Sequence, residues 1–217
     1  MIIVIQCAKK KKEQAGCMQR SDGRKVLFVA DPEKAPAVSG HCYAHPDDTA
    51  DTGRTWREEL VQYNNKSGSN PLGLLPAWEL YEHDAYKKLA NQYGIKNLYI
   101  LSAGWGLIRG DFLTPQYDIT FSGQAPKHTR RRKTDWYDDL RTLPEDTTEP
   151  IVFFVGKGYI PLACELTTMA KAKRYLYYNS NDKPTAPGCI LEKYDTRTRT
   201  NWHYECARAF MDGKIRI

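Results

Sequence analysis

One segment of the chain, Ser102–Phe121, combines a flexible backbone with side chains that could do chemistry. Gly104 and Gly106 allow a sharp turn whose amide N–H groups could hold an anion or a developing oxyanion. Further along, the phenol of Tyr117 could stack on a base. The carboxylate of Asp118 could orient water or stabilise positive charge on a sugar. The alternative interpretation is a glycine turn in which Asp118 only accepts hydrogen bonds from local backbone amides.

A second group of candidates follows the apolar run Ile2–Cys7 at the start of the chain. The thiol of Cys7 could be a nucleophile if neighbouring cations lower its pKa, and a buried structural thiol is the alternative. A block of four lysines comes directly afterwards, and Lys9, Lys10 and Lys12 are its predicted phosphate contacts. A lysine run that is only solvated is the competing interpretation.

Another basic block, residues 127–133, contains Arg130, Arg131 and Arg132. Arginine can hold a phosphate with two hydrogen bonds, and the aromatic Trp136 just downstream could provide a stacking surface for a base. The block is therefore the stronger nucleic-acid candidate of the two, with a flexible basic loop as the alternative.

Gly156-Lys157-Gly158 follows the apolar run Ile151–Val155 and resembles a shortened phosphate loop. It lacks the G-x-x-x-x-G-K-[ST] spacing, which argues against hydrolysis of a nucleoside triphosphate. The amides of this turn, together with Lys157, could still hold a single phosphate. Near the other end of the chain, His203 could be a base, although its aromatic neighbours favour ordinary packing.

Zinc is a rival hypothesis, because Cys17, His41, Cys42 and His45 lie within thirty residues of one another. The segment has no C-x-x-C pair, and the adjacent His41 and Cys42 fit poorly into one tetrahedron. We therefore expect no metal and no cofactor. The six cysteines, without an export signal, are expected to be free thiols.

Hydrophobic patterning predicts the elements that must position these residues. Continuous apolar runs predict buried strands at Ile2–Cys7, Lys25–Ala30, Asn97–Ser102, Ile151–Val155 and Arg174–Tyr178. Helical spacing predicts a short helix capped by Thr55, and further helices over Pro76–Tyr93, Asp135–Leu143, Tyr159–Lys171 and Asn201–Met211.

Strands that alternate with helices predict an α/β fold with a mostly parallel central sheet flanked by helices. The length of 217 residues suits a single domain over residues 1–217. We expect a surface excursion at about residues 31–53 and a basic loop at about residues 123–134. Because ligands gather at the carboxyl ends of parallel strands, Cys7, Ser102 and Gly156 are expected to converge on one site.

Composition narrows the class of protein. The formal net charge of +6 is a mild basic bias, compatible with a phosphate-bearing partner, and the charged fraction of 27% is typical of globular proteins. No stretch reaches the roughly 18 to 20 apolar residues of a membrane helix. The lysine block follows the apolar amino terminus, which reverses the order of a secretory signal, so we expect a cytoplasmic protein without a membrane partner.

Two of these segments together resemble the YaaA-like superfamily of peroxide-stress proteins and their bacterial relatives. The segment LSAGWGLIRGDFLTPQYD, residues 101–118, is similar to that family's strand, Ser-x-x-Tyr/Trp-Gly-Leu, acidic stretch and Pro-Tyr-Asp or Pro-Tyr-Arg, with Gln116 inserted here. The amino-terminal VIQCAKKKK is similar to the Ile-x-Cys-x-x-Lys-Lys-Lys opening of some relatives. The resemblance implies an α/β fold with a basic cleft, nucleic-acid binding and kinship to enzymes acting on nucleobases. The site residues that it implies are Cys7, Lys10, Ser102, Gly106, Tyr117 and Asp118.

Two principal hypotheses for function follow. The first is a glycosylase-like enzyme that cleaves or exchanges the N-glycosidic bond of a base, with Asp118, Tyr117, Ser102 and Cys7 as catalytic residues. Its expected phosphate-binding residues are Lys9, Lys10, Lys12, Gly104, Trp105, Gly106, Arg130, Arg131, Arg132 and Lys157. The second is a noncatalytic DNA- or RNA-binding protein in stress protection or phage defence. The expected partner is nucleic acid, with DNA favoured over RNA, or a nucleotide.

Overall fold

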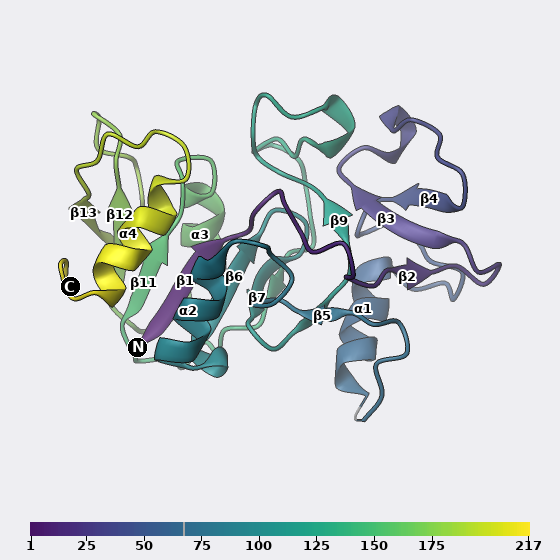
Figure 1. The fold of residues 1–217 in the computed structure, drawn as a ribbon, viewed down its shortest axis with the longest axis horizontal. Helices are drawn as coiled ribbons and strands as arrows, with labels where there is room; N and C mark the ends of the chain where they lie inside the picture. Colours follow the sequence, from purple (N-terminus) through teal and green to yellow (C-terminus); the bar gives the residue numbers. More distant parts are fainter. Residues whose placement is uncertain (67) are drawn as a thin grey trace.

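The computed structural model of the chain describes residues 1–66 and 68–217, and its centre is a seven-stranded sheet (Figure 1). In spatial order the strands are β10 (Leu140–Arg141), β7 (Gly106–Arg109), β6 (Leu98–Ser102), β1 (Ile2–Gln6), β11 (Ile151–Phe154), β12 (Arg174–Tyr178) and β13 (Cys189–Lys193). The pairing of β6 with β7 is antiparallel, and the other neighbouring pairs are parallel. The predicted α/β class with a mostly parallel sheet is confirmed.

The three central strands are the apolar runs that the sequence marks most clearly. Ile3 of β1 pairs with Leu98 of β6 on one side and with Val152 of β11 on the other. All three side chains are completely buried, as expected for strands that are covered on both faces of the sheet.

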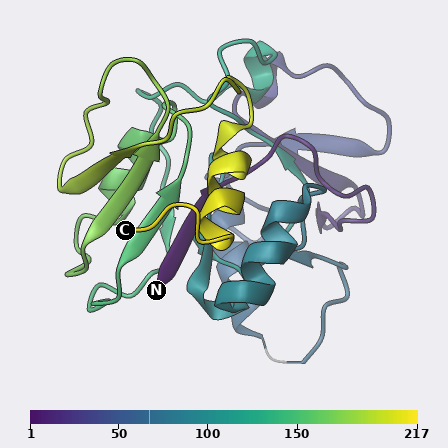
Figure 2. The same cartoon turned by 60° about the vertical axis from the view of Figure 1, so that its left-hand side comes forward.

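Helices cover both faces of this sheet. On one face α2 (Asp84–Tyr93) and α4 (Trp202–Met211) pack side by side, with α2 against β1 and β6 and α4 against β11 (Figures 1 and 2). The short helix α3 (Ile160–Leu166) joins β11 to β12. Because parallel crossovers are right-handed, α3 lies on the opposite face from α2.

The direction of winding reverses between β1 and β11. From β1 the chain crosses to β6 on one side, whereas from β11 it continues through β12 and β13 on the other. In open α/β sheets such a switch point leaves a crevice at the carboxyl ends of the strands, and ligands bind there.

A smaller sheet stands beside the main one (Figure 1). Its strand β3 (Lys25–Val29) pairs with β2 (Met18–Gln19), β4 (His41–Ala44) and β9 (Tyr117–Asp118). The remaining elements are helix α1 (Trp56–Asn65), the ribbon of β5 (Leu75–Pro76) with β8 (Leu113–Thr114), and the 3-10 turns η1 (Pro32–Lys34), η2 (Ile95–Asn97) and η3 (Lys127–Thr129). The strand predicted near residue 25 therefore forms, but outside the main sheet, and the segment at residues 31–53 contains η1 and β4.

Three predicted helices differ from the structure. The helix expected over residues 135–143 is absent, because Leu140 and Arg141 pair with β7 as strand β10. Helix α2 begins only at Asp84, where the side chain of His83 caps it by accepting a hydrogen bond from Ala85 N. Helix α3 ends at Leu166, earlier than predicted. The helix expected after Thr55 forms with a full capping box.

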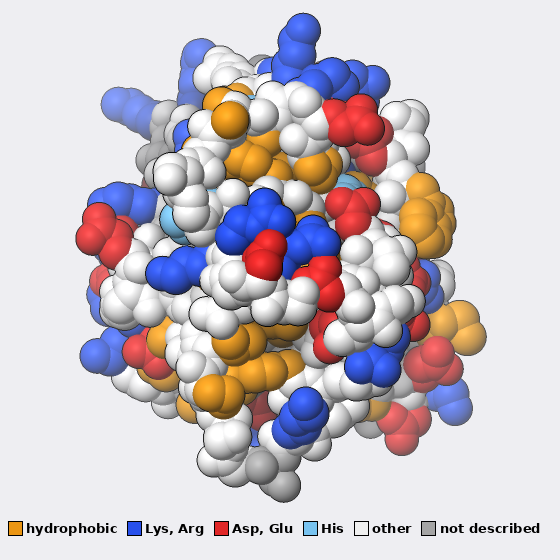
Figure 3. Space-filling view, turned by 90° about the vertical axis from the view of Figure 1, so that its right-hand side faces the viewer, with side chains coloured by type: hydrophobic (Ala, Val, Ile, Leu, Met, Phe, Trp, Pro, Cys, Tyr) orange, Lys and Arg blue, Asp and Glu red, His pale blue; other side chains and the backbone are white. Residues whose placement is uncertain are grey.

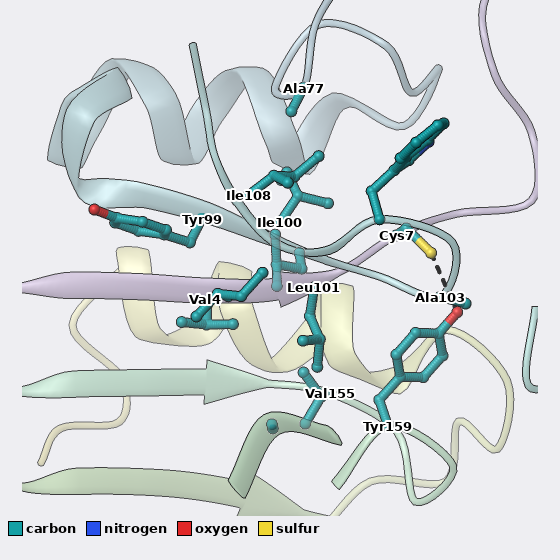
Figure 4. Packing of buried hydrophobic residues seen from close by; sticks show 14 of the residues in the cluster. Val4, Cys7, Ala77, Tyr99, Ile100, Leu101, Ala103, Ile108, Val155 and Tyr159 are labelled. Atoms are coloured by element: carbon teal, nitrogen blue, oxygen red, sulfur yellow. Dashed lines mark hydrogen bonds between the residues drawn. The ribbon is translucent and has the colours of Figure 1, made fainter. Parts of the chain in front are cut away.

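One hydrophobic cluster connects the two sheets. Val4, Ile100 and Ile108 pack within the main sheet (Figure 4), and the ring of Trp105 stands edge-on to Phe28 of the smaller sheet at 4.9 Å between centroids. In the part of the chain that the structure describes, no helix is both long enough and apolar enough to cross a membrane.

Candidate functional site

A pocket of about 280 Å³ lies at the switch point of the sheet. Residues 6–9 at the end of β1 and residues 156–159 at the end of β11 form two of its walls. Residues 120–122 after β9 form the third wall, and Asn201, His203 and Tyr204 at the start of α4 form the fourth. Two of the three strand ends predicted to converge, at Cys7 and Gly156, therefore meet at one cavity, which we call the carboxyl-edge pocket. Ser102, the third, is completely buried and does not line it.

The lining of the carboxyl-edge pocket carries positive charge without acidic residues. Lys9 and Lys157 are its charged side chains, and no Asp or Glu is among the lining residues. Asn201, the N-cap of α4, has a left-handed backbone with φ of 63° and its side chain makes no capping hydrogen bond. The partial positive charge of a helix amino terminus thus adds to the two ammonium groups, and the pocket favours an anion.

His203 offers an unused polar atom to the same pocket. The residue is only 4% exposed, and its Nε2 has no hydrogen-bond partner among the described residues. Burial lowers the pKa of His203 to about 4, with His83 nearby as a second cause, so its imidazole is neutral at pH 7. A buried polar atom without a partner is costly, and because this nitrogen is closed to solvent, a ligand would reach it only after a movement of the side chain.

Cys7 and Tyr159 meet on the wall of the pocket, where the two side chains point toward each other (Figure 4). The Sγ of Cys7 lies 3.2 Å from the hydroxyl oxygen of Tyr159. Backbone hydrogen bonding from Cys7 N to Leu101 O holds the residue against β6. Burial raises the pKa of Tyr159 well above its usual value, so the phenol keeps its proton and can donate it in this hydrogen bond.

Ser102, Tyr117 and Tyr81 form a buried hydrogen-bonded chain. The Oγ of Ser102 donates to the Tyr117 hydroxyl at 2.9 Å, and the hydroxyls of Tyr117 and Tyr81 are 2.7 Å apart. The same Ser102 Oγ accepts hydrogen bonds from the amides of Gly104 and Trp105 at 3.2 and 3.1 Å. These amides are therefore already used, and the anion cradle predicted at this turn is closed to a ligand.

Trp105 and Gly106 have structural tasks as well. Trp105 was predicted to contact phosphate, but its side chain is completely buried and out of reach of a ligand. Gly106 has φ of 86°, and a Cβ there would lie 2.6 Å from the backbone N and O of Leu140. Only glycine lets β10 approach so closely, so packing alone accounts for a glycine at this position.

Lys11, which the sequence analysis did not select from the lysine block, is the member that lies over the buried phenols. Its Nζ is 3.9 Å from the centroid of the Tyr117 ring and donates to Ala8 O at 3.3 Å. Burial lowers the pKa of Lys11 to about 8, although Cys7 and Asp118 partly offset this. A backbone bridge between Lys11 and Tyr81 places this lysine, and no local sequence pattern reveals that contact.

Asp118 lies beside the carboxyl-edge pocket rather than on its lining. In the extended segment 117–120 the side chains alternate, so that Tyr117 and Ile119 are buried in the core while Asp118 and Thr120 share the other side. Thr120 lines the pocket, and Asp118 is near enough to Lys11 to raise the pKa of that amine. The carboxylate therefore lies close to Lys11 and on the same side of this segment as Thr120, which is the nearer of the two to the pocket.

The other lysines of the amino-terminal block divide between the pocket and ion pairs. Lys9 is exposed and lines the pocket. Lys10 pairs with Glu82 at 2.6 Å, and Lys12 pairs with Glu79 at 3.3 Å. The prediction that all three contact phosphate is thus supported by geometry only for Lys9, because the other two already face carboxylates.

Arg131, a predicted phosphate contact, already has structural partners for most of its guanidinium. It is 6% exposed, grips both carboxylate oxygens of Asp139, and donates to Ala103 O at 2.9 Å. Its guanidinium also lies 3.7 Å from the centroid of the Tyr137 ring. Arg57 forms a second buried ion pair, with Asp47. It also donates to Gly104 O, in the turn that Arg131 contacts through Ala103 O.

The rest of the basic block is more open. Arg130 is half-buried and donates to Ala125 O at 2.7 Å, whereas Arg132 and Lys133 are exposed. Trp136 is 76% exposed. These three exposed residues line a second pocket of about 280 Å³ that shares Phe121 and Gly158 with the carboxyl-edge pocket, so the two cavities adjoin.

A different face of the molecule carries charges of both signs. On the side of the smaller sheet, Lys and Arg side chains lie next to Asp and Glu side chains (Figure 3). At the smaller sheet, β2 and the turn that follows it contribute ion pairs of Arg20 with Asp51 and of Arg24 with Asp22. A polyanion would therefore meet mixed charge on this face.

Three of the four residues of the zinc hypothesis, His41, Cys42 and His45, have separate surroundings. Cys42 Sγ faces Lys25 O at 3.6 Å, His41 is exposed, and the His45 ring packs against Tyr137 at 4.3 Å. Across residues 1–66 and 68–217, no group of three or more His, Cys, Asp and Glu side chains is placed to hold a metal ion.

Comparisons of the chain with protein-family models, with curated proteins and with solved structures find no match.

Proposed function

We propose that the chain binds a phosphate-bearing nucleotide, free or within nucleic acid, in the carboxyl-edge pocket and cleaves its N-glycosidic bond. The observation that carries the proposal is the acid-free lining of a switch-point pocket, with Lys9, Lys157 and the start of α4 directed at one cavity. The volume of about 280 Å³ is near the lower end of the range for small-molecule sites, roughly 300–1,000 Å³. It suits one nucleotide unit better than a long ligand.

Recognition in this proposal divides between the two ends of the nucleotide. Lys9, Lys157 and the amides at the start of α4 hold the phosphate. The side chain of Asn201, which is exposed and lines the pocket, supplies hydrogen bonds to the sugar or base. The ring of Tyr159, which lines the pocket, offers an aromatic surface.

Cleavage of an N-glycosidic bond builds positive charge on the sugar. Water adds its oxygen to the anomeric carbon, the carbon–nitrogen bond breaks, and the base leaves with the electron pair and takes up a proton. Asp118 beside the pocket stabilises the charged sugar or aligns the water. Tyr117 and Ser102 act here as positioning residues, since both are buried in the hydrogen-bonded chain behind Asp118. The Cys7 thiol, held by Tyr159, contacts the substrate.

Release of free base, measured by liquid chromatography from normal and modified nucleotides and oligonucleotides, tests the proposal. Asp118→Asn removes the charge with little change in size and should lower turnover at least ~100-fold while leaving ligand binding intact. Asp111→Asn is the matched control, because Asp111 is exposed and pairs with Arg109. A folded Asp118→Asn protein with wild-type turnover would remove Asp118 from the mechanism.

A second candidate function, binding of nucleic acid without catalysis, is favoured by one specific feature. Trp136 is exposed beside Arg132 and Lys133, and a cationic surface with an accessible aromatic ring suits a single strand. Changing Arg132 and Lys133 to Ala should flatten the salt dependence by ~0.7 log unit per lost contact on a single strand. Lys96→Ala, at the opposite end of β6, is the control. A wild type that binds oligonucleotides but releases no base would support this candidate over the first.

The resemblance to the YaaA-like superfamily stays a prediction. It agrees with the nucleotide proposal in placing Cys7 and Asp118 at one site. The proposal itself depends on the charge and position of the carboxyl-edge pocket.

A further inference from the structure

Two thiols lie close together at the far side of the main sheet from the smaller one. Cys164 belongs to α3 and Cys189 begins β13, and their Sγ atoms are 3.8 Å apart. Both are free thiols. Cys164 is buried, whereas Cys189 is half-buried and therefore open to small reagents.

The backbone around both cysteines is held by one buried arginine. Arg174 of β12 donates to Cys164 O at 3.2 Å and to Thr167 Oγ1 at 3.3 Å in the α3 region. It also donates to Pro187 O at 3.3 Å, two residues before Cys189. Arg174 and Cys189 are register partners in the parallel pairing of β12 with β13. The two thiols are thus held near each other by a common neighbour.

Gly188 shows how closely this arginine packs against the strand that carries Cys189. Its φ is 71°, and a Cβ at this position would lie 2.0 Å from Nη2 of Arg174. Any other residue would push the guanidinium away from both cysteine segments.

We propose that Cys164 and Cys189 form a reversible disulfide, a modification site that joins α3 to the edge strand β13 when the protein meets a peroxide. The Sγ atoms must move about 1.8 Å closer, from 3.8 Å to the ~2.05 Å of a disulfide bond. The inference is independent of the proposed nucleotide chemistry.

The surroundings activate one thiol of the pair. The pKa of Cys164 is lowered to about 7, first because the Cys189 thiol donates a hydrogen bond to its thiolate and further because the Arg174 charge is near. Burial opposes this and raises the pKa. The pair therefore holds a substantial thiolate fraction at neutral pH, and a small peroxide reaches it from the side of half-buried Cys189.

The chemistry balances with hydrogen peroxide as the oxidant. The thiolate of the pair attacks one peroxide oxygen, the O–O bond breaks, and the products are a sulfenic acid and hydroxide. The other sulfur of the pair then attacks the sulfenic sulfur, the S–O bond breaks, and the oxygen leaves as water with the thiol proton. Two electrons pass from the two sulfurs to the peroxide.

Cys206 provides a matched control. It is completely buried in α4, and burial raises its pKa, so its thiol is protonated and inaccessible at neutral pH.

The test uses the reduced full-length chain treated with hydrogen peroxide, then alkylated, digested with trypsin and mapped by mass spectrometry. Lys171 and Arg174 lie between the two cysteines, and both are tryptic cleavage sites, so a disulfide appears as one cross-linked peptide pair. We expect two of the six cysteines to become protected, with Cys164 linked to Cys189 and full reversal by dithiothreitol. The oxidised chain should also melt at a higher temperature than the reduced chain.

Cys164→Ser and Cys189→Ser should each abolish the cross-link, and Cys206→Ser should leave it unchanged. Recovery of Cys164 and Cys189 as separately alkylated or sulfinic peptides from the wild type would overturn the proposal. So would a cross-link between either residue and another cysteine. Because the wild-type map decides the question, a serine variant that fails to fold does not affect the outcome.

Discussion

Arg131→Ala should destabilise the protein strongly, because this residue makes three interactions in a nearly dry environment. The substitution leaves the Asp139 carboxylate, 7% exposed at the side chain, without its cation. It also removes the donor to Ala103 O and the cation that stacks on Tyr137. Breaking a buried pair by removing one partner costs ~3–5 kcal/mol. A domain with a total stability of about 5–15 kcal/mol would lose a large share of it.

Urea unfolding followed by far-ultraviolet circular dichroism measures this loss. Arg132→Ala is the matched control, since Arg132 is the exposed neighbour in sequence and should change the free energy of unfolding by less than ~0.5 kcal/mol. The double variant Arg131→Met with Asp139→Leu should recover most of the stability, because it removes both charges and keeps apolar volume.

A loss below about 1 kcal/mol for Arg131→Ala would refute the reasoning, because it would mean that water reaches the Asp139 carboxylate. Equal losses of unfolding free energy for Arg131→Ala and Arg132→Ala would also refute it, because the buried and the exposed arginine would then contribute the same stability. The result also bears on nucleic-acid binding. A triple substitution of Arg130, Arg131 and Arg132 would confuse unfolding with lost phosphate contacts, so Arg131 must be tested separately.

Three further predictions concern buried polar groups. Lys11→Met should raise the free energy of unfolding at pH 7. The pKa of Lys11 in the folded chain is about 8, below the ordinary 10.5, so the buried ammonium destabilises the fold. Urea titrations should show this gain in stability shrinking as the pH rises from 8 toward 10.5. His203→Gln should flatten the acid limb of stability, since a folded pKa of about 4 against the usual 6.5 makes the unfolded chain bind the proton first. The wild type should lose at most roughly 3 kcal/mol through this group between pH 6.5 and 4, and an unchanged profile in the variant would contradict the burial. Tyr117→Phe should cost ~1–3 kcal/mol in urea unfolding, because Ser102 and Tyr81 lose their shared hydroxyl partner.

The centre of the fold could be predicted because its signals are local. Strands buried on both faces must be continuously apolar, and Ile2–Cys7 and Ile151–Val155 have this pattern without interruption. Their carboxyl ends were expected to converge, and the structure places both on one pocket. By contrast, strand β13 has the mixed sequence CILEK with no residue fully buried, so no periodicity marks it.

The site could be predicted only in part, because burial of polar side chains depends on partners far away in the sequence. Nothing in the block of residues 127–133 distinguishes Arg131, which is buried by Asp139 and Ala103, from exposed Arg132. In the same way, Lys11 is separated from its lysine neighbours only by its packing on Tyr117. Charge runs therefore locate a site in the chain without showing which members are free to bind.

The central claim is that the carboxyl-edge pocket receives the phosphate of the nucleotide whose base is released. The most direct test compares base release from nucleoside 5′-monophosphates with release from the matching nucleosides, using the wild type and Lys157→Met. We expect the wild type to prefer the phosphorylated substrate by at least ~10-fold, about 1.4 kcal/mol for one charge-assisted contact, and Lys157→Met to lose that preference. Equal rates with and without the phosphate, or no release from any nucleotide or oligonucleotide, would contradict the account.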